Sequence, residues 1–449
     1  MKPRQFYFRV FGTICIAIIS FCFFIYPAFV SIKLAIAPSF RKPELNNYTL
    51  SMFYTVSKEY EHWANHYRKS KYAGSVATEN VAGTEWPMFG SVFYLIIADD
   101  IKSDLASRDP KYLKRVTPQM MKSVEAAAAI VADTTTATWV QQIWGKDYLK
   151  KENVFYRMLL ISGLAHYEHL SGKTTYRAIL AEQTESLSAE LSKAKYHLLD
   201  DYPGECYPND ILWSAAAILY ADKILGTNHQ LLANQVMHTF TSVSTTEFGI
   251  PPYMAEPDTG KMVERPRGCG NSGILIYAPV LDSKIAKQWY QNYEKYFWQD
   301  NGFCRGFREH SKTLNYSYSD VDSGPVIGGY GSVAAVFGIG AARANGRLDH
   351  SVPLTQEVIV CCYPTPFGLL IPKVMGWSLA DSACLGETAL LFSMTRKVQA
   401  TGVVPFTGRT PLLVWVAFLI YFSLGLVLLY LEYRSWKKWL KKPEPSTSE

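Results

Sequence analysis

The sequence lacks the motifs of several common enzyme classes. Its 449 residues contain no Cys-x-x-Cys pair and no cysteine–histidine spacing typical of a zinc site. No Gly-x-Ser-x-Gly motif marks a serine hydrolase, and no glycine-rich phosphate loop follows a predicted strand. We therefore expect neither a bound metal nor a cofactor.

Charge is also scarce, and it is balanced through most of the chain. Charged residues make up 19% of the sequence. Of the 45 basic and 39 acidic residues, nine and three lie within 1–37 and 432–449, which leaves 36 of each between them. A nucleic-acid-binding domain carries a basic surplus, so this balance argues against a nucleic-acid partner.

Both ends of the chain have the composition of membrane spans. Val10–Ile32 is uncharged for 23 residues and Pro411–Leu431 for 21, close to the roughly 20 that cross a bilayer. Basic residues precede the first run and follow the second, so the positive-inside rule puts both termini in the cytoplasm. Ala35-Ile36-Ala37 resembles a signal-peptidase site, but the run before it is longer than a signal peptide needs, which favours an uncleaved anchor.

This pattern predicts a protein of the inner (plasma) membrane, with the lipid bilayer as one partner and a periplasmic main domain. Protein partners are left open. The predicted segments are a cytoplasmic N-terminus and first span (1–37), an exported domain (38–410), a second span (411–431) and a basic cytoplasmic tail (432–449).

The exported region reads as helical throughout. Helical periodicity recurs in twelve segments separated by loops rich in Gly, Pro, Asn and Asp. The predicted helices are 48–69, 87–103, 111–131, 152–171, 174–196, 209–226, 229–243, 271–281, 283–298, 325–345, 349–362 and 381–397.

Twelve helices at this spacing suit six helical hairpins closed into an all-α (α/α)6 toroid between two transmembrane helices. The even-numbered segments, such as 209–226 and 325–345, are rich in apolar and small residues and fit an inner ring. The odd-numbered segments, such as 48–69 and 283–298, are more polar and fit an outer ring.

Three loops that enter predicted inner helices concentrate the candidate catalytic and binding residues, because helix N-termini offer free backbone donors to a ligand. Each loop could instead supply only helix caps and turns. The candidates in these loops are Glu205, Cys206, Tyr207, Asn209 and Asp210 in the first, Arg267 and Asn271 in the second, and Asp320 and Asp322 in the third.

Two weaker signals lie elsewhere. Glu85 and Trp86 would place an acid beside an aromatic platform at the mouth of another helix. His166 and His169, three residues apart, could ligate a metal, but no third ligand follows at zinc spacing, so we expect His166 to point inward and His169 to meet solvent.

Six cysteines lie in the exported region, where disulfides are permitted. A domain of this size has a core large enough to fold without them. We expect mostly buried free thiols with one or two bridges among Cys206, Cys269, Cys304, Cys361, Cys362 and Cys384.

Several of these loops together resemble a known bacterial family. They are similar to segments of membrane-anchored helical-toroid proteins related to linalool dehydratase/isomerase. The similar segments are Tyr167–Gly172, Pro203–Asp210, Pro257–Gly260, Arg267-Gly268 with Asn271-Ser272, and Asp320–Pro325. The resemblance covers about 80–400, and its scaffold is shared with six-hairpin glycosidases. It implies cofactor-free acid/base chemistry with an aspartate, a histidine and two cysteines, for which His166 and Cys206 are the matching positions.

One departure from that pattern bears on the chemistry. The helix after Cys206 runs through Ala215, Ala216 and Ala217 and offers no second cysteine nearby. The leading hypothesis is therefore an envelope-glycan glycosidase or lyase, with Glu205 or Asp210 opposite Asp320 or Asp322. The alternatives are an isomerase-like lyase on a small apolar alcohol, centred on His166 and Cys206, and a non-catalytic toroid that binds an envelope polymer.

Overall fold

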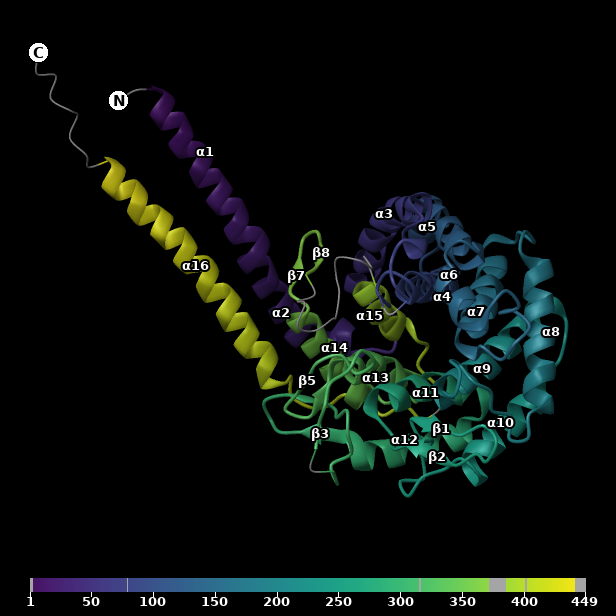
Figure 1. The fold of residues 1–449 in the computed structure, drawn as a ribbon. Coiled ribbons are helices and arrows are strands. Elements are labelled where there is room, and N and C mark those ends of the chain that lie inside the picture. The colour runs from purple at the N-terminus through teal and green to yellow at the C-terminus, as the bar shows by residue number, and fades with distance from the viewer. Residues whose placement is uncertain (1–2, 79, 315, 371–384, 400–401, 441–449) are drawn as a thin grey trace, which may run out of the picture.

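The computed structural model describes residues 3–440 except 79, 315, 371–384 and 400–401. Within these residues the chain is mostly helical, with short hairpins of strand between the helices (Figure 1). Residues 381–384 of the predicted helix 381–397 and residues 441–449 of the basic tail lie outside the described residues.

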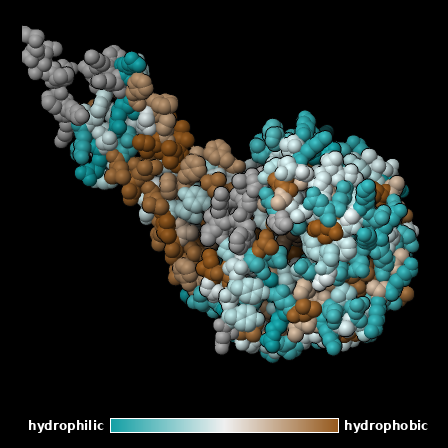
Figure 2. Space-filling model, in the orientation of Figure 1, coloured by the Kyte–Doolittle hydropathy of each residue, from teal (hydrophilic) through white to brown (hydrophobic). Residues whose placement is uncertain are grey.

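The terminal helices form a pair that projects from the rest of the molecule (Figure 1). α1 (Pro3–Ser20), a five-residue π-helix (Phe21–Ile25) and α2 (Tyr26–Ile36) run on without a break, and α16 (Leu412–Leu440) packs along them in the opposite direction. Both are long and apolar enough to cross a membrane. Their exposed apolar surface forms the brown band of Figure 2.

Small and polar residues hold this helix pair together. A Cβ on Gly425 would lie 2.7 Å from Cδ1 of Ile25, so the missing side chain allows the close approach. Ser20 donates a hydrogen bond to the carbonyl oxygen of Gly425 (3.0 Å). Nearer the termini, Arg9 pairs with Glu432 at 3.1 Å.

The region between the spans contains an inner and an outer set of helices. Each inner helix packs against the next in chain order, and the last, α15, packs against the first, α4. The inner helices are α4 (Glu85–Arg108), α7 (Val154–Ser171), α9 (Pro208–Leu225), α11 (Gly268–Leu281), α13 (Ser332–Ala344) and α15 (Leu385–Thr395).

The outer helices each pack against an inner neighbour. They are α3 (Asn47–Ser70), α5 (Pro110–Ala132), α8 (Arg177–Lys193), α10 (Gln230–Ser242), α12 (Ser283–Phe297) and α14 (Leu348–Cys361). Their sequences explain the position: α12 buries Ala286, Trp289, Tyr290 and Tyr293, which share one face of a helix. The inner helix α4, in contrast, buries every residue from Val92 to Asp99.

Short antiparallel hairpins close four of the loops in the described residues. The paired strands are β1 (Met254–Ala255) with β2 (Met262–Glu264), β3 (Trp298–Asp300) with β4 (Arg305–Phe307), β5 (Val326–Ile327) with β6 (Tyr330–Gly331), and β7 (Pro364–Thr365) with β8 (Gly368–Leu369).

The predicted helices agree with the structure apart from two segments. The first part of 325–345 is wrong: α13 begins only at Ser332, and the residues before it form the β5–β6 hairpin. Gly328 and Gly329 form the turn with φ of 59° and 88°, a left-handed conformation that a helix cannot use. The short helix α6 (Thr138–Trp144) was not predicted.

The prediction of one or two disulfides is not met by the cysteines that the structure describes. Cys384 lies outside the described residues. The free thiols are Cys15, Cys22, Cys206, Cys269, Cys304, Cys361 and Cys362.

Candidate active site

Three carboxylates gather where the inner helices begin. Glu85 is the first residue of α4, Asp210 lies in the first turn of α9, and Asp322 belongs to the loop before β5. Pro208 opens α9, where the lack of an N–H costs nothing. The charges of Asp210 and Asp322 both act on Glu85, so acids from three distant segments share one site.

Burial is the main cause that raises the pKa of Glu85 to about 7; a hydrogen bond from Tyr202 opposes the rise, and the neighbouring Asp322 and Asp210 carboxylates add to it. Burial likewise raises the pKa of Asp210 to about 7, with Asp322 adding to the effect. A carboxyl group poised near neutral pH can both donate and accept a proton, as a general acid or base must.

The remaining acids of this region differ in their exposure and in their pKa. Burial raises the pKa of Asp322 and that of the buried Asp201, which lies near Asp210. Glu205 is exposed at the rim, where it accepts a hydrogen bond from the Tyr207 hydroxyl (2.8 Å). Of the acids in the two predicted loops, Asp210 and Asp322 are therefore the two that act on each other inside the site.

Hydroxyl and amide groups surround the carboxylates. Tyr253 donates to Oδ2 of Asp322 (2.6 Å), and its ring meets that of Tyr207 edge-on at 5.4 Å. The Asn209 amide donates to Asp210 (2.8 Å), while Oδ1 of Asn209 is buried without a hydrogen-bond partner. A buried acceptor of this kind is satisfied by a donor on a ligand or water.

Arg267, one of the predicted binding residues, is held between two carboxylates. Its guanidinium bonds to buried Glu309 (2.9 Å) and to Asp320 (2.8 Å) and lies over the ring of Tyr253. Burial disfavours the Asp320 carboxylate, but Arg267 outweighs it and lowers the pKa of Asp320. With its charge already paired, Arg267 is suited to fixing the loop that carries Asp322.

Below the carboxylates the inner helices contribute a layer of aromatic rings, which we call the aromatic floor. It consists of Phe89, Phe93, Trp213, Tyr277 and Phe392, from α4, α9, α11 and α15. Trp213 stacks on Tyr277 at 4.8 Å and lies parallel to Phe93 at 6.0 Å. Glu85 and Asp210 precede Phe89 and Trp213 by about one helical turn, so the acids lie directly above these rings.

His166 lies on the other side of the aromatic floor. Its Nδ1 bonds to Asp99 (2.7 Å), and its ring stacks on Tyr220 at 4.0 Å. Tyr220 is twelve residues beyond Pro208 on α9, about 18 Å along the helix axis. The structure therefore does not bring His166 together with Cys206, as an isomerase-like site would need.

Asp99 joins two histidines at that far end. Nδ1 of His169 bonds to its second oxygen (2.7 Å). Burial opposes ionisation of Asp99, but the hydrogen bonds from His166 and Tyr220 outweigh it and hold its pKa well below the usual range. The His169 side chain is 49% exposed and that of His166 13%, as predicted from the sequence. Among the described residues no group of three or more potential ligands could hold a metal.

The other predicted site residues, Cys206, Asn271 and Trp86, are buried or half-buried in the helical domain. Cys206 is fully buried, and burial together with nearby Asp201 raises the pKa of its thiol, which disfavours a thiolate nucleophile. Asn271 is buried and donates to the carbonyl oxygens of Pro251 and Arg267. Trp86 is partly buried in the first turn of α4, next to Glu85.

Sequence reasoning missed several residues of this region. Tyr202 flanks the predicted loop, while Tyr253 and Glu309 lie far from it in sequence. Only the fold brings Tyr253 to Asp322 and Glu309 to Arg267.

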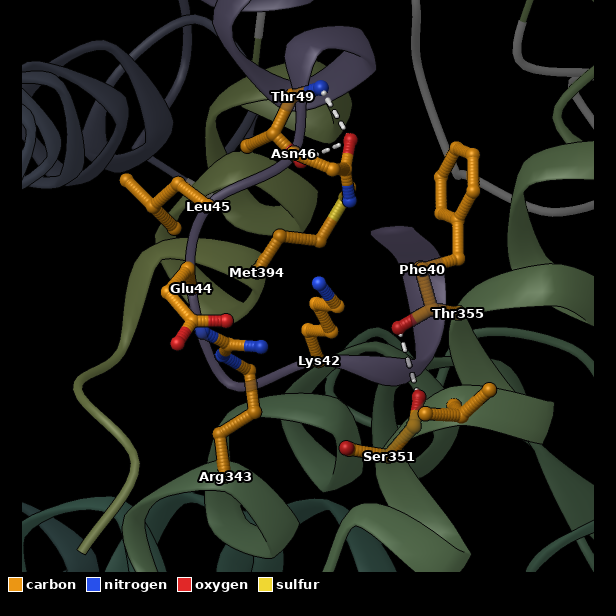
Figure 3. Close-up of a pocket in the computed structure, with 11 residues that line it drawn as sticks. Phe40, Lys42, Glu44, Leu45, Asn46, Thr49, Arg343, Ser351, Thr355 and Met394 are labelled. Carbon is orange, nitrogen blue, oxygen red and sulfur yellow. Dashed lines mark hydrogen bonds between the residues drawn. The ribbon is translucent and has the colours of Figure 1, made fainter. Parts of the chain in front are cut away.

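A separate small cavity lies away from the carboxylates, between the start of α3 and helices α13, α14 and α15 (Figure 3). Its volume is about 20 Å³, room for about one water molecule and not for a substrate. Lys42, Glu44 and Arg343 lie around it.

The comparisons with known proteins add no family to this description. No protein-family model matches the chain, and no curated protein is significantly similar to it.

Proposed function

We propose that the chain is a two-span protein of the inner membrane whose inner and outer helices form an (α/α)6 toroid outside the cytoplasm. The closed order of contacts from α4 to α15 and back supports the toroid. The antiparallel pairing of the terminal helices and the basic residues near both termini support the topology.

We propose further that this domain is an enzyme that cleaves a cell-envelope or exported glycan by carboxylate acid/base chemistry. The observation that carries the proposal is the cluster of Glu85, Asp210 and Asp322 above the aromatic floor. Glycan cleavage requires a protonated acid together with an ionised partner.

In the hydrolytic version, protonated Glu85 or Asp210 gives its proton to the glycosidic oxygen as the bond to the anomeric carbon breaks. Ionised Asp322 removes a proton from water, whose oxygen bonds to that carbon. We expect inversion, with a separation of about 6.5–9.5 Å between the two carboxyl groups. In the lyase version the base takes a carbon-bound proton and no water is consumed.

The isomerase-like alternative has less support. It needs His166 and Cys206 in one pocket, and the aromatic floor lies between them. The raised pKa of the buried Cys206 thiol also disfavours it as a nucleophile. A toroid that binds a polymer without cleaving it would show no turnover in the experiment below.

The experiment incubates the purified full-length protein with fractionated envelope and exported glycans and analyses the products. New reducing ends indicate hydrolysis, and an unsaturated sugar indicates a lyase. Asp322→Asn is expected to abolish either product, whereas Asp104→Asn, a half-buried acid near the other end of α4 that pairs with Arg108, is the matched control and is expected to keep full turnover. Binding without product in every fraction would contradict the enzymatic proposal.

A further inference from the structure

The segment between α14 and α15 contains a long uncharged run. No charged residue occurs between Glu357 and Lys373, and the run includes the β7–β8 hairpin. In the structure β7 packs against α2 and β8 against α3. The hairpin rises beside the first span, on the side toward which α1 leaves the helical domain (Figure 1).

The cytoplasmic edge of the two spans can be located from one ion pair. Arg9 and Glu432 meet at 3.1 Å, and the basic residues of both termini follow on that side. A hydrocarbon core of about 30 Å corresponds to about 20 helical residues. Counted from this pair, the outer edge of the core falls near Phe29 on α2 and near Leu412 on α16.

Two contacts place the end of α14 beside parts of the spans that lie inside the hydrocarbon core, on the cytoplasmic side of that outer edge. The Tyr421 hydroxyl donates to the carbonyl oxygen of Val360 (2.8 Å), and Tyr421 lies nine residues inside Leu412, about 13 Å along the helix. The Tyr363 hydroxyl donates to the carbonyl oxygen of Phe23, six residues or about 9 Å inside Phe29. A tyrosine side chain spans only part of these depths.

The hairpin tip has the chemistry of a lipid-facing segment. Phe367 is 72% exposed and Leu370 50%. Pro364 and Pro366 carry no backbone N–H that would be left unsatisfied in hydrocarbon. The Thr365 hydroxyl donates to the carbonyl oxygen of Gly368 (2.8 Å) and accepts from the N–H of Phe367, so the turn satisfies its own polar groups.

We propose that the β7–β8 hairpin is immersed in the outer leaflet, where Phe367 and Leu370 contact lipid acyl chains. This inference rests on the two-span topology proposed above and goes beyond it, because it puts part of the exported domain inside the bilayer.

The test uses the full-length protein in liposomes of phosphatidylethanolamine and phosphatidylglycerol, with p-benzoyl-phenylalanine in place of Phe367. In a second sample the same group replaces Leu231 of α10, which is also 72% exposed but belongs to an outer helix away from the spans. After illumination, mass spectrometry of the peptides is expected to find lipid adducts at 367 and none at 231.

Equal adduct levels at both positions, or none at 367, would overturn the immersion of the hairpin. A third sample with the probe at Leu419, exposed on α16, reports the span itself. Adducts at 419 without adducts at 367 reject the hairpin and keep the span, while their absence at both positions rejects the two-span topology.

Discussion

The acids of the site differ in ionisation because their neighbours differ. Asp320 is close to the Arg267 guanidinium and is held ionised. Glu85 and Asp210 have no cation among the groups that shift them, so burial and the neighbouring carboxylates keep protons on them up to neutral pH. The same residue type thus serves in two ways: Asp320 is fixed in an ion pair with Arg267, while Glu85 and Asp210 can donate protons near neutral pH.

Burial of Glu85 has a consequence for stability that depends on pH. Its pKa is about 7 in the folded chain and 4.5 as the ordinary value, so between those values the folded state holds a proton that the unfolded state has lost. The free energy of unfolding therefore falls as the pH rises from about 4.5 through about 7. Thermal unfolding in detergent at pH 5 and pH 8 measures this loss of stability.

Glu85→Gln removes this titration and is expected to reduce the loss of stability between the two pH values. Glu59→Gln, which changes an exposed side chain of α3, is the control and should leave the difference in stability between the two pH values unchanged. An equal loss of stability in the Glu85→Gln and wild-type proteins would contradict the assignment.

The buried pair of Arg267 and Glu309 gives a second prediction. Both side chains are almost fully buried, so Arg267→Met leaves an uncompensated charge and is expected to lower the free energy of unfolding by about 3–5 kcal/mol. The double variant Arg267→Met, Glu309→Leu is expected to regain most of that loss. Denaturant unfolding of the three proteins checks it, and additive losses in the double variant would contradict the pairing.

These residue-scale features were only partly predictable. Asp210, Asp322 and Glu85 could be singled out because each lies at or just before a predicted apolar helix. Their shared site could not, since it depends on how the fold brings the start of α4, the start of α9 and the loop before β5 together. The roles of Arg267 and Asn271 could not be predicted either, because their partners Glu309 and Pro251 are 42 and 20 residues away in sequence.

At the scale of elements, periodicity predicted most helices well because a polar and an apolar face alternate along them. It failed at 325–331, where small apolar residues continue the pattern of α13 while Gly328 and Gly329 turn the chain back. A turn that needs left-handed residues overrides a helical pattern, and α6 is too short for any period to be read.

The crossing of the two terminal helices gives a prediction with a matched control. Gly425→Leu would push the side chain into Ile25 and Phe24 and separate the helices. We expect a lower thermal midpoint in detergent and less protein in the membrane. Gly12→Leu, on the first span with open space around it, should change neither. Equal effects of both variants would contradict the close packing at Gly425.

At the scale of the whole molecule, cleavage of an envelope or exported glycan requires the helical domain to lie outside the cytoplasm. Reporters fused after residue 40 and after residue 405 are expected to read as exported, because basic residues near both termini favour the cytoplasm. A cytoplasmic signal from either fusion would contradict this topology. The fusions test the spans independently of any enzymatic activity.

The most direct test of the central claim is the pH dependence of kcat/KM on the glycan fraction that yields product. We expect a bell-shaped profile whose limb near pH 7 belongs to the Glu85 and Asp210 cluster. Asp210→Asn is expected to shift or remove that limb and to lower kcat/KM by about 10²–10⁴-fold. Full activity with an unchanged profile in both Asp210→Asn and Glu85→Gln would contradict it.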